Sequence, residues 1–198
     1  MTTVGVLALQ GDVAEHRAAF AKIVGPDGVR LVRTPRDLAG VQALVIPGGE
    51  STAISELVDR NGLRTPLLER IARGLPVLGT CAGLIVLAER LEPSPAGRDP
   101  VSLQVLDVGV RRNEYGRQRE SFEAEVRVEG LTGDPFPGVF IRAPRILEFG
   151  KKVRPFAWRD EEVVGVRHGT LWGLTFHPEL SGDPRIAEAF LRETVGSS

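Results

Sequence analysis

A single cysteine lies where a protein chain can present a reactive sulfur. Residues 79–84 read GTCAGL, so Cys81 stands between Gly79 and Gly83. Flanking glycines allow a sharp bend from strand to helix that exposes the thiol, as in the G-x-S-x-G nucleophile elbow with sulfur in place of oxygen. The start of a helix also favours the thiolate, which is the reactive form. The alternative is a small buried hydrophobe, the usual state of a free cysteine.

A nucleophile needs a base, and the sequence has three histidines. His16 falls in an amphipathic helical stretch, which favours a solvated or interface position, and His168 in RHGT is typical of an exposed hairpin turn. His177 begins HPEL, and Pro178 disfavours helical geometry there. Residues two apart in an extended chain share a face, so Glu179 is predicted to project beside His177 and fix the tautomer of its imidazole. Alternatively, His177 is an ordinary histidine at a strand end.

A second glycine-rich bend, PGGES (47–51), offers backbone donors. Gly48 and Gly49 expose N–H groups with no side chain in the way. One of them, together with the N–H of Ala82, is suited to hold the oxyanion of a tetrahedral intermediate. The alternative is a plain strand-to-helix turn capped by Ser51, and both interpretations can hold together.

These residues need elements that carry them. Apolar stretches predict strands, and helical patterns with caps predict helices between them. The predicted strands are 4–9, 29–34, 43–47 and 76–79. The first predicted helix is capped by Asp12, with Glu15 completing a capping box. Three further helices are predicted, from Ser51 to about Asp59, from about Pro66 to Arg73, and from Ala82 to about Leu91. Ligands bind at the carboxyl ends of parallel strands, which is where both glycine-rich bends fall.

The second half of the chain has a different rhythm. From about Ser102, strand-like stretches follow one another through turns, and Asp183-Pro184 begins a final helix. We therefore expect an α/β fold, a three-layer α/β/α sandwich whose central sheet is mostly parallel with antiparallel additions in the second half. Residues 1–198 are expected to form one domain.

Composition limits the partners of this chain. Hydrophobic residues make up 42% and charged residues 26%, as in an ordinary globule, and the formal net charge is −1. No basic surface field is available for nucleic acid or an anionic membrane, so neither is expected as a partner. One cysteine excludes an internal disulfide and a multi-cysteine metal site. With no basic leader or long apolar run, we expect a cytoplasmic protein.

Several motifs together resemble a known family. PGGEST, GTCAG and FHPEL are similar to those of the triad (class I) glutamine amidotransferases. The stretches LALQGDVAEH, RRNEYGRQ, SFEAEV and GVFIRAP narrow the resemblance to the glutaminase subunits of pyridoxal 5′-phosphate synthase, from about Val4 to Leu180. Many class I relatives carry a glutamine at the position of Ile85. This chain has isoleucine there, and in this it resembles the vitamin B6 branch. The residue type at position 12 is expected to vary within that branch, so Asp12 does not weaken the resemblance.

The resemblance implies roles for individual residues. Cys81 would be the nucleophile, His177 the general base and acid, and Glu179 the orienting carboxylate, with backbone N–H groups of Gly49 and Ala82 as the oxyanion hole. Gln10 would lie near that hole and the partner interface. The resemblance also implies a glutamine pocket formed by Gly49, Glu50, Ser51, Arg112, Ile141 and Arg142. A guanidinium can pair with a carboxylate, although a surface ion pair is the common alternative for an arginine.

The implied reaction is hydrolysis of L-glutamine to L-glutamate and ammonia. The resemblance also implies that the ammonia passes to a (β/α)₈ synthase subunit that builds pyridoxal 5′-phosphate. No metal and no organic cofactor are expected in this chain. Two alternatives stay open here. One is a glutaminase subunit of another synthase, such as imidazole glycerol phosphate synthase, and the other is a non-catalytic partner-binding protein of the same fold.

Overall fold

The structure, a computed structural model, describes residues 2–93, 99–112 and 121–196. The strands are β1 (Val4–Leu7), β2 (Val29–Val32), β3 (Ala43–Ile46), β4 (Val77–Thr80), β5 (Ala88–Leu91), β6 (Leu106–Arg111), β7 (Ser121–Val128), β8 (Phe136–Ile141), β9 (Arg145–Phe149), β10 (Arg154–Arg159), β11 (Glu162–His168) and β12 (Leu171–Leu174). The α-helices are α1 (Val13–Val24), α2 (Ser51–Arg60), α3 (Arg64–Ala72), α4 (Ala82–Leu87) and α5 (Arg185–Thr194). Three 3₁₀ turns are η1 (Pro26–Gly28), η2 (Pro35–Leu38) and η3 (Pro178–Leu180).

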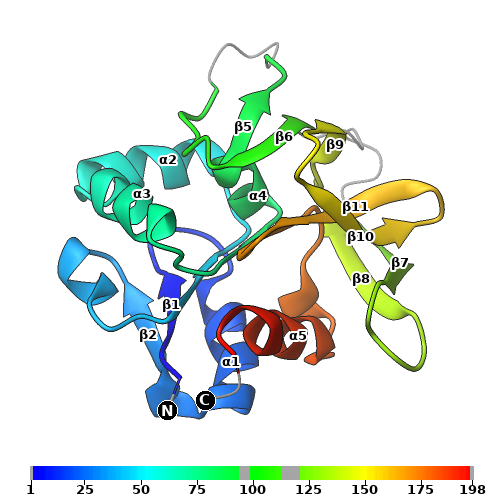
Figure 1. The fold of residues 1–198 in the computed structure, drawn as a ribbon, viewed down its shortest axis with the longest axis horizontal. Coiled ribbons are helices and arrows are strands. Elements are labelled where there is room, and N and C mark those ends of the chain that lie inside the picture. The colour runs from blue at the N-terminus through cyan, green and yellow to red at the C-terminus, as the bar shows by residue number, and fades with distance from the viewer. Residues whose placement is uncertain (1, 94–98, 113–120, 197–198) are drawn as a thin grey trace.

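The strands form a mixed sheet through the middle of the molecule (Figure 1). Its order is β2-β1-β3-β4-β12-β11-β10-β7-β8. The first five strands in this order are parallel, and the pairings from β11 to β8 are antiparallel. β5, β6 and β9 form a second, smaller sheet in the order β5-β6-β9. This arrangement agrees with the predicted α/β fold, parallel at first and antiparallel later.

Helices cover both faces of the parallel strands (Figure 1). In β3, Leu44 and Ile46 belong to the core under α2, α3 and α4, whereas Ala43 and Val45 belong to the core under α1 and α5. Successive side chains of a strand point to opposite faces, so four consecutive apolar residues are what a strand covered on both sides needs. No described helix combines the length and the apolar character that crossing a lipid bilayer requires.

The parallel strands end together at one edge of the sheet. Ile46 of β3 pairs with Gly79 of β4, and Thr80 of β4 pairs with Leu174 of β12. The loops that follow β1, β3, β4 and β12 therefore meet, and each carries residues singled out in the sequence. The site is assembled at this edge, as expected for an open parallel sheet.

The predicted helix from Ala82 to about Leu91 is wrong in its second half. Helix α4 ends at Leu87, and residues 88–91 form β5, which pairs with β6. All six residues of α4 are buried. A short apolar run has the same pattern in a buried helix and in a strand, so periodicity alone could not locate the change.

Two predicted helix caps are also wrong. Asp12 stands at the N-cap of α1, but its side chain makes no capping hydrogen bond. Ser51 is the first residue of α2, and the cap is Glu50, whose carboxylate accepts hydrogen bonds from the N–H groups of Thr52 at 3.0 Å and Ala53 at 2.7 Å. Both differences place an acidic side chain next to the candidate site.

Candidate active site

Cys81 lies at the tight turn between β4 and α4, with φ 49° and ψ −104°. A positive φ is uncommon for a residue with a side chain and has to be held by the surrounding structure. Gly83 makes the turn possible, because a Cβ there would lie 2.0 Å from the carbonyl oxygen of Ile46. The cysteine is only 6% exposed, yet it lines a cavity. The sulfur is thus shielded from bulk solvent and reachable from the cavity.

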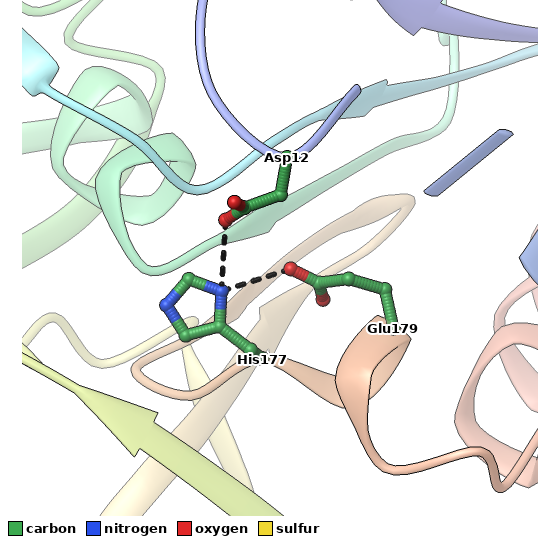
Figure 2. Close-up of side chains that lie close together, drawn as sticks. All are labelled: Asp12, His177 and Glu179. Atoms are coloured by element: carbon green, nitrogen blue, oxygen red, sulfur yellow. Dashed lines mark hydrogen bonds and ion pairs between the residues drawn. The ribbon is translucent and has the colours of Figure 1, made fainter. Parts of the chain in front are cut away.

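His177 follows β12, and its backbone N–H donates to the carbonyl oxygen of Val139 in β8 at 2.8 Å. Its Nδ1 lies 2.9 Å from Oε1 of Glu179, whose side chain is fully buried (Figure 2). The geometry behind this contact differs from the predicted one. Residues 178–180 form the turn η3 rather than an extended segment, and the turn brings Glu179 back toward the ring.

A second carboxylate reaches the same nitrogen. Oδ2 of Asp12, at the start of α1, lies 3.2 Å from Nδ1 of His177 (Figure 2). The Asp12 side chain is 33% exposed and lines the same cavity as Cys81. This engagement explains the missing cap, because the carboxylate that would cap α1 faces His177 instead. The N–H of Asp12 donates to the carbonyl oxygen of Gly48 at 3.0 Å, which joins the loops after β1 and β3.

His16 is buried inside the molecule, with 1% exposure, and not solvated as predicted. Its Nε2 lies 2.9 Å from Oγ1 of Thr80 and 3.3 Å from Oε2 of Glu179. Thr80 directly precedes Cys81 in the chain. His16 therefore connects the strand that ends at the cysteine with the carboxylate behind His177. His168, predicted to be exposed in a turn, is half-buried at the end of β11.

The electrostatics favour a charged imidazole. Burial lowers the pKa of His177, but interactions with Asp12, Cys81 and Glu179 outweigh burial and raise the pKa from 6.5 to about 12. Burial likewise raises the pKa of Glu179, yet its contacts with His16 and His177 lower the pKa from 4.5 to about 2. The ring Nε2 of His177 makes no aligned hydrogen bond to any described residue, so it is available to another group in the cavity.

The cavity at this edge of the sheet measures about 150 Å³. It brings together Cys81 and His177 with all six residues that the resemblance assigned to a glutamine pocket. Its lining residues are Asp12, Gly49, Glu50, Ser51, Cys81, Ala82, Ile85, Arg112, Ile141, Arg142 and His177. Glu179 is not in the lining because it is buried behind His177. The thiol of Cys81 donates to the carbonyl oxygen of Ile141 at 3.7 Å.

The loop after β3 packs closely on its neighbours. A Cβ at Gly49 would lie 2.4 Å from Oε1 of Gln10, so a side chain cannot replace the hydrogen there. The same Gln10 oxygen accepts a hydrogen bond from the N–H of Glu50 at 2.7 Å. Gln10 thus holds the loop that carries the predicted oxyanion donor Gly49. Gln10 therefore lies beside the cavity, because Gly49 and Glu50 are among the residues that line it.

Arg112 closes the cavity on the side of α2. Its Nη2 lies 3.4 Å from Oγ1 of Thr52 and 3.5 Å from Oε1 of Glu50, and its Nη1 lies 3.3 Å from Oδ1 of Asp99. Burial raises the pKa of Glu50, but hydrogen bonds from the Thr52 and Ala53 N–H groups and the charge of Arg112 lower it below its usual value. Arg142 has φ 42° at the end of β8. The rest of the RRNEYGRQ motif, residues 113–118, lies outside the described residues.

Asp12, His177 and Glu179 also have the donor types of a metal site. One potential ligand atom from each lies within 4.8 Å of the others. The imidazole would have to give up the Nδ1 hydrogen that both carboxylates approach in order to bind a metal there. These contacts are those of a hydrogen-bonded imidazole, and the absence of a metal or cofactor stays a prediction.

Sequence reasoning missed the site roles of Asp12, His16 and Thr80. The four-residue spacing of Asp12 and His16 puts them on one face of α1, which is a usable signal. It went unused because an acidic residue before an amphipathic helix normally predicts a cap. Thr80 carried no signal beyond its place before Cys81.

The α/β fold, with a mixed sheet that is parallel at first and antiparallel later, is shared with glutamine amidotransferases of known structure. A crystal structure of a glutamine amidotransferase has a TM-score of 0.88 and 43% identity, and the match covers 97% of this chain and 98% of that one. A glutamine amidotransferase from Thermotoga maritima, at 16% identity and a TM-score of 0.59 with full coverage of both chains, shares the fold.

Residues 6–196 match the SNO glutamine amidotransferase family, and this chain belongs to that family. The pyridoxal 5′-phosphate synthase subunit PdxT of Pyrococcus horikoshii is 51% identical over 197 residues, which are 97% of this chain and 99% of that protein. These similarities favour the vitamin B6 branch over the other synthases considered from the sequence.

Proposed function

We propose that Cys81, His177 and Glu179 hydrolyse L-glutamine to L-glutamate and ammonia, and that the ammonia is used to make pyridoxal 5′-phosphate. The chain is a glutaminase subunit of pyridoxal 5′-phosphate synthase, as its family and its 51% identical relative indicate. The observation that carries the catalytic proposal is the shared cavity: Cys81 lines it together with His177, while Glu179 holds the ring from behind.

In the first half-reaction, the thiolate of Cys81 attacks the side-chain carbonyl carbon of glutamine. Negative charge develops on the carbonyl oxygen, where backbone N–H groups of Gly49 and Ala82 stabilise it. The protonated His177 gives its Nε2 hydrogen to the departing nitrogen as the carbon–nitrogen bond breaks. Ammonia leaves, and a γ-glutamyl thioester remains on Cys81.

In the second half-reaction, His177 acts as a base. It takes a proton from a water molecule, whose oxygen attacks the thioester carbon. The carbon–sulfur bond breaks, glutamate is released, and the thiolate–imidazolium pair forms again. Glu179 contributes by keeping the Nδ1 hydrogen in place, so that the lone pair of Nε2 faces the cavity in this step.

The remaining pocket residues suit a free amino acid. Arg112 and Arg142 offer guanidinium groups for the α-carboxylate of glutamine, and Glu50 offers a carboxylate for its α-ammonium group. Ser51 lies beside them at the start of α2, and Gly49 and Ile141 complete the wall. These assignments extend the roles that the family resemblance implies.

The product needs a protected route. Ammonia in water at neutral pH is mostly protonated and then cannot act as a nucleophile. We therefore propose direct transfer to a (β/α)₈ synthase subunit, with Gln10 near the contact and with low glutaminase activity until that subunit binds. Residues 1–198 act as one glutaminase domain in this proposal, and a cytoplasmic location stays a prediction from the sequence.

The test uses the assembled complex of this chain with its synthase. Cys81→Ala should abolish formation of pyridoxal 5′-phosphate from glutamine and the sugar phosphates, while added ammonium salt should restore it. Rescue by ammonium shows that the synthase is intact, and co-purification of the variant with the synthase shows that the variant still folds. Undiminished glutamine-dependent synthesis by Cys81→Ala would refute the proposal.

A further inference from the structure

Asp12 holds a position for which the proposed mechanism gives no use. An aspartate before a helix usually accepts hydrogen bonds from the first free N–H groups of that helix. The Asp12 side chain makes none of these bonds. Instead, its Oδ2 lies 3.2 Å from Nδ1 of His177 (Figure 2). Helix α1 therefore lacks a side-chain cap at Asp12, whose carboxylate contacts the imidazole instead.

The two carboxylates that face His177 differ in their surroundings. Glu179 has a fully buried side chain, and His16 lies 3.3 Å from its second oxygen. Asp12 is 33% exposed and borders the cavity. Nδ1 carries a single hydrogen, which is hydrogen-bonded to Glu179 at 2.9 Å, and the Asp12 oxygen at 3.2 Å makes an ion-pair contact with the same nitrogen.

We propose that Asp12 is a second carboxylate of the triad, a positioning residue that holds the Nδ1 hydrogen of His177 alongside Glu179 and takes over when Glu179 cannot. This inference rests on the proposed role of His177 in glutamine hydrolysis. Asp12 comes from α1 and Glu179 from η3, so the ring is oriented from two independent elements. The loss of one carboxylate then leaves a hydrogen-bond acceptor of the same charge in place.

The proposal also fixes the direction of a pH effect. The charged or titratable groups that face His177 are Asp12 from α1, Cys81 from the β4–α4 turn and Glu179 from η3, and the loop after β3 meets the ring with the uncharged Gly48. Removing the charge of Asp12 takes away one interaction that stabilises the imidazolium. The pKa of His177 then falls. His177 must be neutral in the thioester intermediate, where Cys81 no longer carries the charge that raises this pKa, so the acid limb of kcat reports deprotonation of His177 in that intermediate and moves to lower pH.

The test is a double-mutant cycle in the assembled complex, with glutaminase turnover measured on the pH plateau of each variant. The variants are Asp12→Asn, Glu179→Gln and their combination, and Glu15→Gln is the matched control because it removes an exposed charge from the same turn of α1. We expect the double variant to lose at least about tenfold more turnover than the product of the two single losses. The control should match the wild type.

Two results would overturn the proposal. One is a double variant whose loss equals the product of the single losses or that of Glu179→Gln alone. The other, which does not depend on Glu179→Gln folding, is an acid limb of Asp12→Asn that coincides with that of the wild type and of Glu15→Gln. Failure of the proposed function is distinct, because Cys81→Ala and His177→Asn would then retain glutaminase activity.

Discussion

Gly48 lies directly against the imidazole of His177, and a Cβ at Gly48 would come within 2.3 Å of the ring carbon Cε1. The loop after β3 therefore limits where the ring can lie, while Glu179 and Asp12 approach its Nδ1. The same Cβ would also come within 2.7 Å of Oδ2 of Asp12, so Gly48 borders both side chains. A glycine in PGGES is thus required by a side chain more than a hundred residues further along the chain.

Gly48→Ala should displace His177. The added methyl group cannot fit beside the ring, and a shift of about 1 Å in a catalytic group can lower turnover about a hundredfold. Glutaminase turnover of the complex is the measurement. Gly62→Ala is the control, because a Cβ there meets nothing within 4 Å; its positive φ of 68°, which Gly48 does not share, makes the control the more strained backbone position of the two. Equal activity in the two variants would contradict the steric argument.

His16→Leu should destabilise the chain by about 1–3 kcal/mol, because it removes the hydrogen-bond partner of the buried Thr80 hydroxyl and the ring nitrogen that lies 3.3 Å from the buried Oε2 of Glu179. Urea unfolding measures this difference. His168→Leu on the β11 strand end is the matched control and should change the free energy of unfolding by less than about 0.5 kcal/mol. In the double variant with Thr80→Val, the cost of His16→Leu should become smaller, since one orphaned oxygen is gone. Strict additivity would argue against the contact.

Stability should fall at both ends of the pH range. The pKa of Glu179 is lowered in the folded chain from 4.5 to about 2, so its contribution is present above 4.5 and is lost as pH falls from 4.5 to 2. The pKa of His177 is raised above 6.5, so its contribution is complete below pH 6.5 and declines as pH rises further. Unfolding free energies of the wild type across pH should show both declines.

The pH prediction has a variant for each limb. Glu179→Gln should flatten the acid decline, and His177→Gln should flatten the alkaline decline. His168→Gln is the control for the latter and should keep the wild-type slope. A wild-type curve that rises between pH 7 and 9 would contradict the sign worked out for His177.

Arg112→Lys should weaken glutamine binding more than turnover. Lysine keeps the charge but cannot reproduce the fork, whose Nη2 reaches Thr52 and Glu50 while Nη1 reaches Asp99. Losing a hydrogen bond to a charged group raises KM about tenfold or more. Steady-state kinetics of the complex separate KM from kcat. The neighbouring Arg111, which binds Glu92 outside the cavity lining, supplies the control variant Arg111→Lys. Similar KM values for both variants would remove Arg112 from the substrate pocket.

Much of the site was predictable because its chemistry lies in short, local patterns. Glycine is needed at position 79 by the turn itself, because a Cβ there would lie 2.7 Å from the backbone of Gly83. Strand runs such as that of β3 are fixed by burial on both faces. Backbone conformation at these positions depends on immediate neighbours in the chain, so the sequence alone indicated the bends, the strands before them and the edge at which they meet.

Short-range patterns failed where a segment had two acceptable structures. The periodicity of AGLIVLAERL is that of one long helix. In the folded chain, however, α4 ends at Leu87 and the next residues form β5, which pairs with β6. The partner strand begins at Leu106, well beyond any local window. Pairing with it satisfies the backbone groups of residues 88–91, and that gain is visible only when both segments are present.

The sequence by itself determined the fold class, the elbow at Cys81 and the presence of a carboxylate two residues after His177. Only the tertiary structure decided that Asp12 faces His177 rather than capping α1, and that His16 is buried against Glu179 and Thr80. The physical reason is that a helix pattern specifies which side chains share a face, but not what that face meets. Helix α1 packs against η3 and the end of β4, and this packing excludes water from the space between them. The polar side chains buried in that space then interact with one another instead of with water.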